Sequence, residues 1–234
     1  MTSKSHYYLG LYLLSGELYR AESMEQAAFL YGCVEPDFNP GTYIKGSLHG
    51  QKLRGHNFPN MLPCIHRLLE KLQFMEPSGV LYFYRLGKLT HYLTDAFTYP
   101  HNSAFCGSLK DHIKYEAELE PLFLHSLLQC RMPSENDCYG DPYTLFLEAH
   151  QDYLCSEMGK QRDIAFALRV VPGIVHVVFG QTSLVSAEVA KQEVLSANAL
   201  QTGEKFSIPA FALHEEEIYQ ELLAQRRTRP EESA

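Results

Sequence analysis

Apolar residues along most of this chain recur at spacings of three and four, and this spacing limits the possible folds more than any other feature of the sequence. Alternating runs rich in Val, Ile and Thr, joined by Asn-Gly or Asp-Gly turns, would mark β-hairpins, and they are missing. We therefore predict an all-α fold, a single-domain multi-helix bundle. The periodicity predicts helices over residues 6–16, 23–32, 59–75, 79–97, 109–130, 143–158 and 161–200.

Several residues mark the expected ends of these helices. Ser23, Ser78 and Ser108 are placed to act as N-caps, and Asp111 follows Ser108 at the spacing of a capping box. Pro172 is expected to kink or divide the last long helix, because proline cannot donate the helical hydrogen bond.

One long connection and one tail stand out from this pattern. The polar segment from Glu35 to Asn57 contains Gly and Pro and predicts a loop of roughly 25 residues, a length that is often functional. We expect a helical domain over residues 1–202 and a C-terminal tail over 203–234 that is partly disordered.

Charge and composition exclude some classes of function. The formal net charge of −8 argues against duplex nucleic acid, and it allows at most peripheral membrane contact. The N-terminus makes a poor signal peptide, and no apolar run reaches the roughly 18 residues of a spanning helix. The six cysteines show no CxxC spacing, which favours free thiols. We expect a soluble, cytoplasmic protein, and the sequence leaves its oligomeric state open.

The segment from residue 85 to residue 116 carries the candidate chemistry. His91 and Asp95 are four residues apart, as are His112 and Glu116, so each pair projects from one face of its helix. His101 lies between the pairs. Nitrogen and carboxylate oxygen donors in this arrangement suit zinc. A single pair of this kind is often only a surface ion pair, but two pairs and a third His favour a metal site.

Further candidate ligands lie upstream. Asp37 follows a proline and is either a ligand or an ordinary turn residue. His6 and His56 are candidates of similar weight, and His56 is favoured over His49 because it immediately precedes a predicted helix. The remaining histidines lack a carboxylate partner in a matching context and are interpreted as structural: His66, His125, His150, His176 and His214.

Together these motifs resemble the zinc-dependent phospholipase C family, which is related to the trinuclear-zinc single-strand nucleases of plants and fungi. Family members carry His-x3-Asp, a His five or six residues on, and then His-x3-Glu. Here these are His91 to Asp95, His101, and His112 to Glu116. The run His-Tyr-Leu-Thr-Asp also resembles the family's HYLxD core. The early helix His, the loop Asp and the next His of the family are matched by His6, Asp37 and His56.

The resemblance implies a fold of the phospholipase C and single-strand nuclease type, and it implies sets of metal ligands. One zinc ion would be held by Asp37, His56, His91 and Asp95. A second would be held by His101, His112 and Glu116. A third would be shared by His6 and Asp95, and the secreted enzymes complete that site with an N-terminal Trp. This chain has no Trp, so we expect two zinc ions and leave the third open.

The resemblance also implies a reaction. We expect a zinc-dependent phosphoester hydrolase that cleaves phospholipid head-group phosphodiesters with a metal-activated hydroxide. Asp37 would orient that hydroxide or act as general base. Two alternatives remain: a nuclease or small-phosphodiester hydrolase using the same site, and a non-catalytic helical scaffold with a structural zinc.

Overall fold

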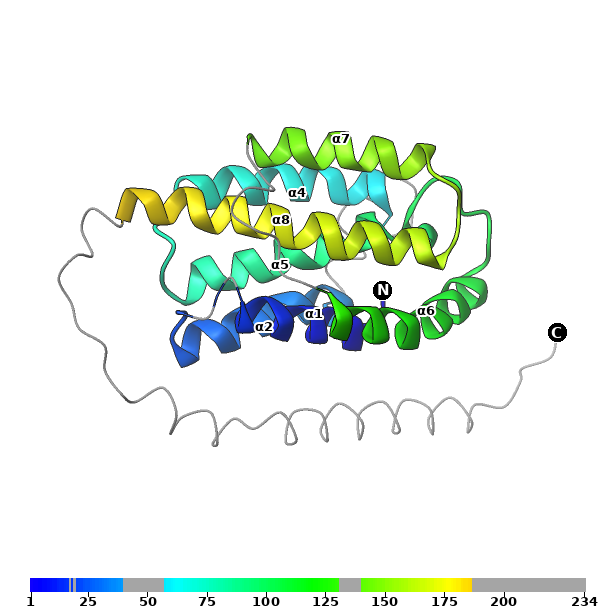
Figure 1. Cartoon of the computed structure of the whole chain (residues 1–234), viewed down its shortest axis with the longest axis horizontal. Coiled ribbons are helices and arrows are strands. Elements are labelled where there is room, and N and C mark those ends of the chain that lie inside the picture. Colours follow the sequence, from blue (N-terminus) through cyan, green and yellow to red (C-terminus); the bar gives the residue numbers. More distant parts are fainter. Residues whose placement is uncertain (17, 19, 40–56, 131–139, 187–234) are drawn as a thin grey trace. The chain divides into compact units, whose positions relative to one another are not determined.

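The computed structural model of the chain describes residues 1–39 except 17 and 19, then 57–130 and 140–186, with only the backbone for 181–186. These residues form seven α-helices and one short 3-10 helix, with no strand among them, so the predicted all-α class is confirmed (Figure 1). The elements are α1 (Ser3–Ser15), α2 (Ser23–Phe38), α4 (Phe58–Gln73), α5 (Val80–Ala96), the 3-10 helix η1 (Tyr99–His101), α6 (Leu109–Gln129), α7 (Pro142–Cys155) and α8 (Lys160–Ser186). The expected tail over 203–234, and the end of the helix predicted to reach residue 200, lie outside the described residues.

The structure confirms the prediction for Ser108 and refines the prediction for Pro172. Ser108 caps α6, because its Oγ accepts the Asp111 N–H and its own N–H donates to the Asp111 carboxylate at 2.8 Å. The helix that contains Pro172 is not divided there, since α8 is continuous across that residue. Pro172 removes one hydrogen bond of the helix, and the burial of this part of α8 in the core compensates for the loss.

At three other helix starts, the first residue or the N-cap differs from prediction. α1 begins three residues early, because the Thr2 side chain accepts the Ser5 N–H and supplies an N-cap. The N-cap of α2 is Glu22 and not Ser23. The Glu22 N–H donates to the Glu25 carboxylate. Ser78 does not cap α5 either, because the next residue, Gly79, holds that position at a φ of +83°, a conformation that favours glycine.

The long connection after the second helix starts later than predicted. α2 continues through Pro36 and ends at Phe38, so Asp37 lies in the last helical turn and not on a loop. The Asn39 N–H still bonds to the Glu35 carbonyl at 3.0 Å, which lets the final turn close despite the proline. Residues 40–56, with His49 and His56 among them, lie outside the described residues.

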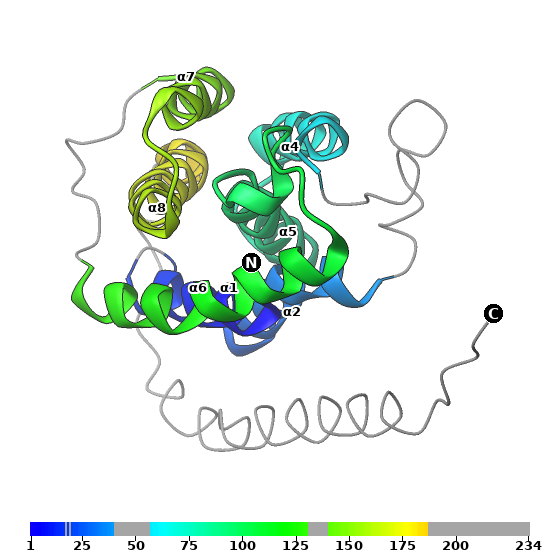
Figure 2. The same cartoon turned by 90° about the vertical axis from the view of Figure 1, so that its right-hand side faces the viewer.

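Helix α5 is the centre of the described bundle. It packs against α1, α2, α4 and α8, and Figure 2 views α4, α5, α7 and α8 nearly end-on. Because α5 is covered on several sides, most of its side chains are buried, His91 and Asp95 included. The apolar contacts around it include fully or almost fully buried Phe83, Leu86, Leu89, Leu93 and Ala96.

Helix α8 is the one described helix that is long and apolar enough to cross a membrane, over Lys160–Gly180. However, 61% of the most apolar window in that segment is buried inside the protein. The helix also packs against α4, α5, α6 and α7. Its apolar character is therefore accounted for by its place in the core.

A pair of glycines sets the distance between α2 and α5. A Cβ built on Gly87 would lie 2.1 Å from the Phe29 carbonyl oxygen, and one on Gly32 would lie 2.3 Å from the Tyr84 carbonyl oxygen. Only glycine allows the two backbones to approach this closely. The close approach brings the C-terminal turn of α2, with Asp37, toward the part of α5 that follows Gly87.

We predict that Gly87→Ala lowers the free energy of unfolding by about 3 kcal/mol, since backbone atoms must move apart to admit the methyl group. The matched control is Gly180→Ala in α8, where an added Cβ meets no atom within 4 Å. That change should stabilise the protein by about 0.5–1 kcal/mol through helix propensity. Urea denaturation of both variants measures the difference, and equal stabilities would contradict the close-approach account.

Candidate metal centre

The structure brings seven of the predicted site residues into two neighbouring groups. In each group, one candidate ligand atom per residue lies within 4.8 Å of every other. The first cluster consists of His6 from α1, Asp37 from α2, and His91 and Asp95 from α5. The second cluster consists of His101 from η1, and His112 and Glu116 from α6.

His91 is oriented for metal binding within the first cluster. Its Nδ1–H donates to the Cys33 carbonyl at 2.8 Å, which fixes the ring and its tautomer. Its Nε2 therefore faces the carboxylates, 3.2 Å from Asp95 Oδ2 and 3.6 Å from Asp37 Oδ1. Burial opposes protonation of His91, but Asp95 and Asp37 outweigh it and raise the pKa of the ring. A divalent cation bound here would take the place of that proton.

His6 is stacked against His91, with ring centroids 4.0 Å apart and planes inclined by 27°. Its Nε2 lies 3.1 Å from Asp95 Oδ1. Burial, together with the neighbouring His91, lowers the pKa of His6 to about 4. The imidazole is thus neutral near pH 7, and neutral imidazole is the form that binds metals.

The second cluster converges on one carboxylate oxygen. Nε2 of His101 lies 3.1 Å, and Nε2 of His112 lies 2.9 Å, from Oε1 of Glu116. His112 and Glu116 keep 24% and 15% of their side-chain surface exposed, whereas His101 keeps 5%. Two of the three side chains of this cluster, those on α6, are therefore partly accessible to solvent.

An unexpected group lies between the clusters. The α-amino group of Met1 is 2.5 Å from Asp95 Oδ1 and 2.9 Å from Glu116 Oε1, and the N label lies between α5 and α6 in both views (Figures 1 and 2). Burial disfavours the charged amine, but Asp95 and Glu116 outweigh it and raise its pKa to about 11. The spacing of the motifs does not predict this position. The Thr2 cap fixes where α1 begins, and tertiary contacts bring that end of the helix beside Asp95 and Glu116.

The two carboxylates that contact the Met1 amine, Asp95 and Glu116, remain ionised. Burial would raise the pKa of Asp95, yet His101, the Met1 ammonium and His91 hold it well below its usual range. Burial likewise opposes ionisation of Glu116, and the Met1 ammonium with His101 and His112 holds its pKa well below the usual range. A positive charge already lies between the two carboxylates. The donors around it, imidazole nitrogen and carboxylate oxygen, are those that zinc prefers, so the residues present fit such an ion.

The loop that carries His101 is supported from α7. The Asn102 side-chain amide donates to the carbonyls of Ala96 and Thr98, at 3.0 Å each. His150 Nε2–H in turn donates to Asn102 Oδ1 at 3.0 Å, and its ring is stacked on Phe58. His150 therefore has the structural role that the sequence predicted for it.

The grouping of ligands differs in one respect from that implied by the resemblance. His6 lies in the same cluster as Asp37 and His91, whereas the resemblance placed it at a third ion with Asp95. His56, the expected fourth ligand of the first ion, lies outside the described residues. Zinc ligation by each of these residues remains a prediction.

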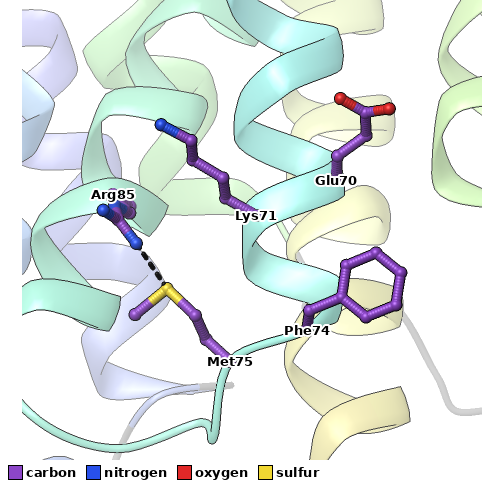
Figure 3. Close-up of a pocket in the computed structure, with 5 residues that line it drawn as sticks. All are labelled: Glu70, Lys71, Phe74, Met75 and Arg85. Carbon is purple, nitrogen blue, oxygen red and sulfur yellow. Dashed lines mark hydrogen bonds between the residues drawn. The ribbon is translucent and has the colours of Figure 1, made fainter.

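A separate hollow of about 450 Å³ lies where α4 is followed by α5, and its lining contains no histidine (Figure 3). An Arg85 guanidinium N–H donates to the Met75 sulfur there at 2.7 Å. With one carboxylate and two cationic side chains, this hollow does not have the donors of a metal site. It is lined by Glu70, Lys71, Phe74, Met75 and Arg85.

These features define a class: all-helical proteins with a buried centre of His and carboxylate donors for divalent metal. The chain belongs to the zinc-dependent phospholipase C family, since the sequence profile described as "Zinc dependent phospholipase C" matches residues 5–163, more than half of the chain. This confirms the resemblance and the fold type that it implied. Neither the curated proteins nor the solved structures yielded a match.

The support of the His101 loop leads to a pH-dependent prediction. Burial lowers the pKa of His150 to about 4, while in the unfolded chain it is near 6.5. Between these values the unfolded state binds more protons, so this group contributes stability above pH 6.5 that is lost as the pH falls toward 4.

His150→Gln keeps an amide donor for Asn102 and does not titrate. Relative to this variant, the wild type should lose at most about 1.4 kcal/mol per pH unit between pH 6.5 and 4. Urea unfolding at several pH values, with zinc removed, measures the difference. Parallel stability curves for the two proteins would show that His150 is not held neutral.

Proposed function

We propose that this chain is a zinc-dependent hydrolase that cleaves phospholipid head-group phosphodiesters. The observation that carries the proposal is the convergence of two His and carboxylate clusters on the buried Asp95 and on Glu116, in a chain of the zinc-dependent phospholipase C family. Family membership implies a phospholipase C-type hydrolase that acts on phospholipids. The choice of bond and substrate in this chain is our proposal.

In this proposal each cluster holds one zinc ion, and a third ion is left open. The first ion is held by His6, Asp37, His91 and Asp95, with His56 as a further ligand. The second ion is held by His101, His112 and Glu116. When bound, zinc lowers the pKa of water toward neutrality and stabilises negative charge on the phosphoryl group. Asp95 can serve both ions, because it lies within 3.5 Å of His101 and also beside His6.

Asp37 is the proposed catalytic residue. Its side chain is 19% exposed, while those of His6, His91 and Asp95 are fully buried. The Ser3 hydroxyl donates to Asp37 Oδ2 at 2.7 Å and fixes the carboxylate. An anchored carboxylate at the open edge of the cluster can accept a proton from the attacking water and orient it toward phosphorus.

The surface near the second cluster favours a lipid substrate. Leu109 and Ile113 are 72% and 46% exposed, and each precedes a cluster residue on α6 by three positions. Residues three apart are neighbours on a helix surface, so apolar side chains lie beside His112 and Glu116. Exposed apolar side chains of this kind bind the acyl region of a lipid surface more readily than a soluble nucleotide.

We also propose a cytoplasmic location. In support, four cysteines within the described segments are free thiols, as is usual in a reducing compartment: Cys33, Cys64, Cys106 and Cys155. Fractionation of the native cells would test the location. Recovery of the protein from the medium would contradict it.

The function is tested by removing one ligand. His112→Ala should lose one zinc ion per chain and lower kcat/KM on phosphatidylcholine by more than about 100-fold, since even outer-shell partners of metals are worth 10–100-fold. His125→Ala, an exposed histidine on the same helix, is the matched control and should keep both zinc and activity. Asp37→Asn should lower kcat, because an amide does not accept the proton.

Zinc content by elemental analysis and head-group release by mass spectrometry provide the readouts. Zinc in the wild type without release of any phosphoester product would favour a structural zinc and end the hydrolase proposal. Faster cleavage of single-stranded nucleic acid or small phosphodiesters than of phospholipid would instead favour that alternative substrate.

A second experiment tests the lipid surface. Leu109→Gln combined with Ile113→Gln should lower the rate on phosphatidylcholine vesicles by at least about tenfold, since burying one such side chain contributes about 1.5–3 kcal/mol. The rate on soluble p-nitrophenyl phosphorylcholine should not change. Leu128→Gln, an 87% exposed leucine near the other end of α6, is the control. Equal losses on both substrates would refute a role in lipid docking.

A further inference from the structure

Asp163, in the first turn of α8, is fully buried and lies outside both clusters. Its carboxylate accepts four hydrogen bonds, from three different parts of the fold and from the neighbouring Arg162. Burial raises the pKa of Asp163, and the donors from Tyr99, Tyr153 and Tyr115 oppose that rise.

The two carboxylate oxygens face different partners. Oδ2 accepts the Tyr99 backbone N–H at 2.8 Å and the Tyr115 hydroxyl at 2.9 Å. Oδ1 accepts the Tyr153 hydroxyl at 2.8 Å and lies 3.5 Å from the Arg162 guanidinium. The partners of Oδ2 lie on η1 and α6, the elements that carry the second cluster. Those of Oδ1 lie on α7 and α8, which carry no cluster residue.

Packing alone does not require a carboxylate at this position. One and two turns further along α8, the same buried face holds Ala167 and Val171. An apolar residue at position 163 would continue that stripe without the cost of burying a polar group. What the carboxylate adds is a pair of oriented acceptors that join three elements.

We propose that Asp163 is a positioning residue that sets the distance between His101 and the His112–Glu116 pair. The proposal rests on the proposed zinc-dependent function. Tyr99 begins the 3-10 turn that ends at His101, so the bond to its N–H fixes that turn. Tyr115 immediately precedes Glu116 on α6. The Tyr115 hydroxyl bonds to Asp163, while the Glu116 carboxylate bonds to His101. The bond of Tyr115 to Asp163 therefore fixes the rotation of α6 about its axis.

The chain supplies a matched pair of variants for the test. Tyr115→Phe and Tyr153→Phe each remove one hydroxyl from the same carboxylate, but only the first loosens an element that carries ligands. Tyr115→Phe should weaken zinc binding at the second cluster by about 10–100-fold and leave the first cluster unchanged, as expected for outer-shell partners of metal ligands. Tyr153→Phe should leave the zinc affinities of both clusters unchanged, although it should lower thermal stability about as much as Tyr115→Phe does.

Competition with a chromophoric chelator resolves the two binding steps, and Glu116→Gln identifies the step of the second cluster. The visible spectrum of the cobalt-substituted protein should change with Tyr115→Phe and not with Tyr153→Phe. Asp163→Asn is a third variant and should weaken the second site as well. If Asp163→Asn does not fold, the comparison of Tyr115→Phe with Tyr153→Phe still tests the positioning role.

The outcomes separate this proposal from the function on which it rests. Zinc binding by the wild type with equal second-site affinities in both tyrosine variants overturns the positioning role alone. Equal weakening of both sites by Tyr115→Phe also overturns it, since the effect is then a general loss of stability. Absence of zinc binding in the wild type overturns the hydrolase proposal and this one with it.

Discussion

The fully buried carboxylate of Asp95 is the group on which the rest of the site depends. Removing a carboxylate from water costs several kcal/mol unless nearby groups compensate. Here the compensation comes from His91 one turn back on α5, from His6 and the Met1 ammonium on the N-terminal side of α1, and from His101 on η1. Three elements must therefore meet at one point. A bound cation would satisfy the same requirement, which is why the arrangement fits a metal centre.

The bundle holds these elements in place through contacts at some distance from the ligands. The glycine contact between α2 and α5 brings Asp37 toward α5, and Asn102 closes the turn that precedes the second cluster. Asp163 reaches the same turn from α8. A site assembled from several helices needs such supports, because an error of about 1 Å in one ligand is costly.

Much of the fold and the centre of the site could be predicted from the sequence. Apolar spacing determines helix faces, and the i,i+4 pairs place His and carboxylate on one face, so the class and both pairs were predictable. Asp37 was wrongly predicted to lie on a loop, because the predicted helix ended at residue 32 and Asp37 follows a proline, whereas α2 continues through Pro36 to Phe38. The position of the Met1 amine depends on tertiary contacts that no local pattern encodes. Asp163 could have been found from the sequence, because it is a carboxylate four residues before Ala167 on an apolar helix face.

The central claim is that the two clusters bind zinc. The most direct measurement is anomalous X-ray scattering at the zinc edge from crystals of the purified protein. The account predicts one peak about 2.0–2.2 Å from the donor atoms of His6, Asp37, His91 and Asp95, and another at that distance from those of His101, His112 and Glu116. Peaks elsewhere in the protein, or no peak at either cluster in crystals grown with zinc, would contradict it.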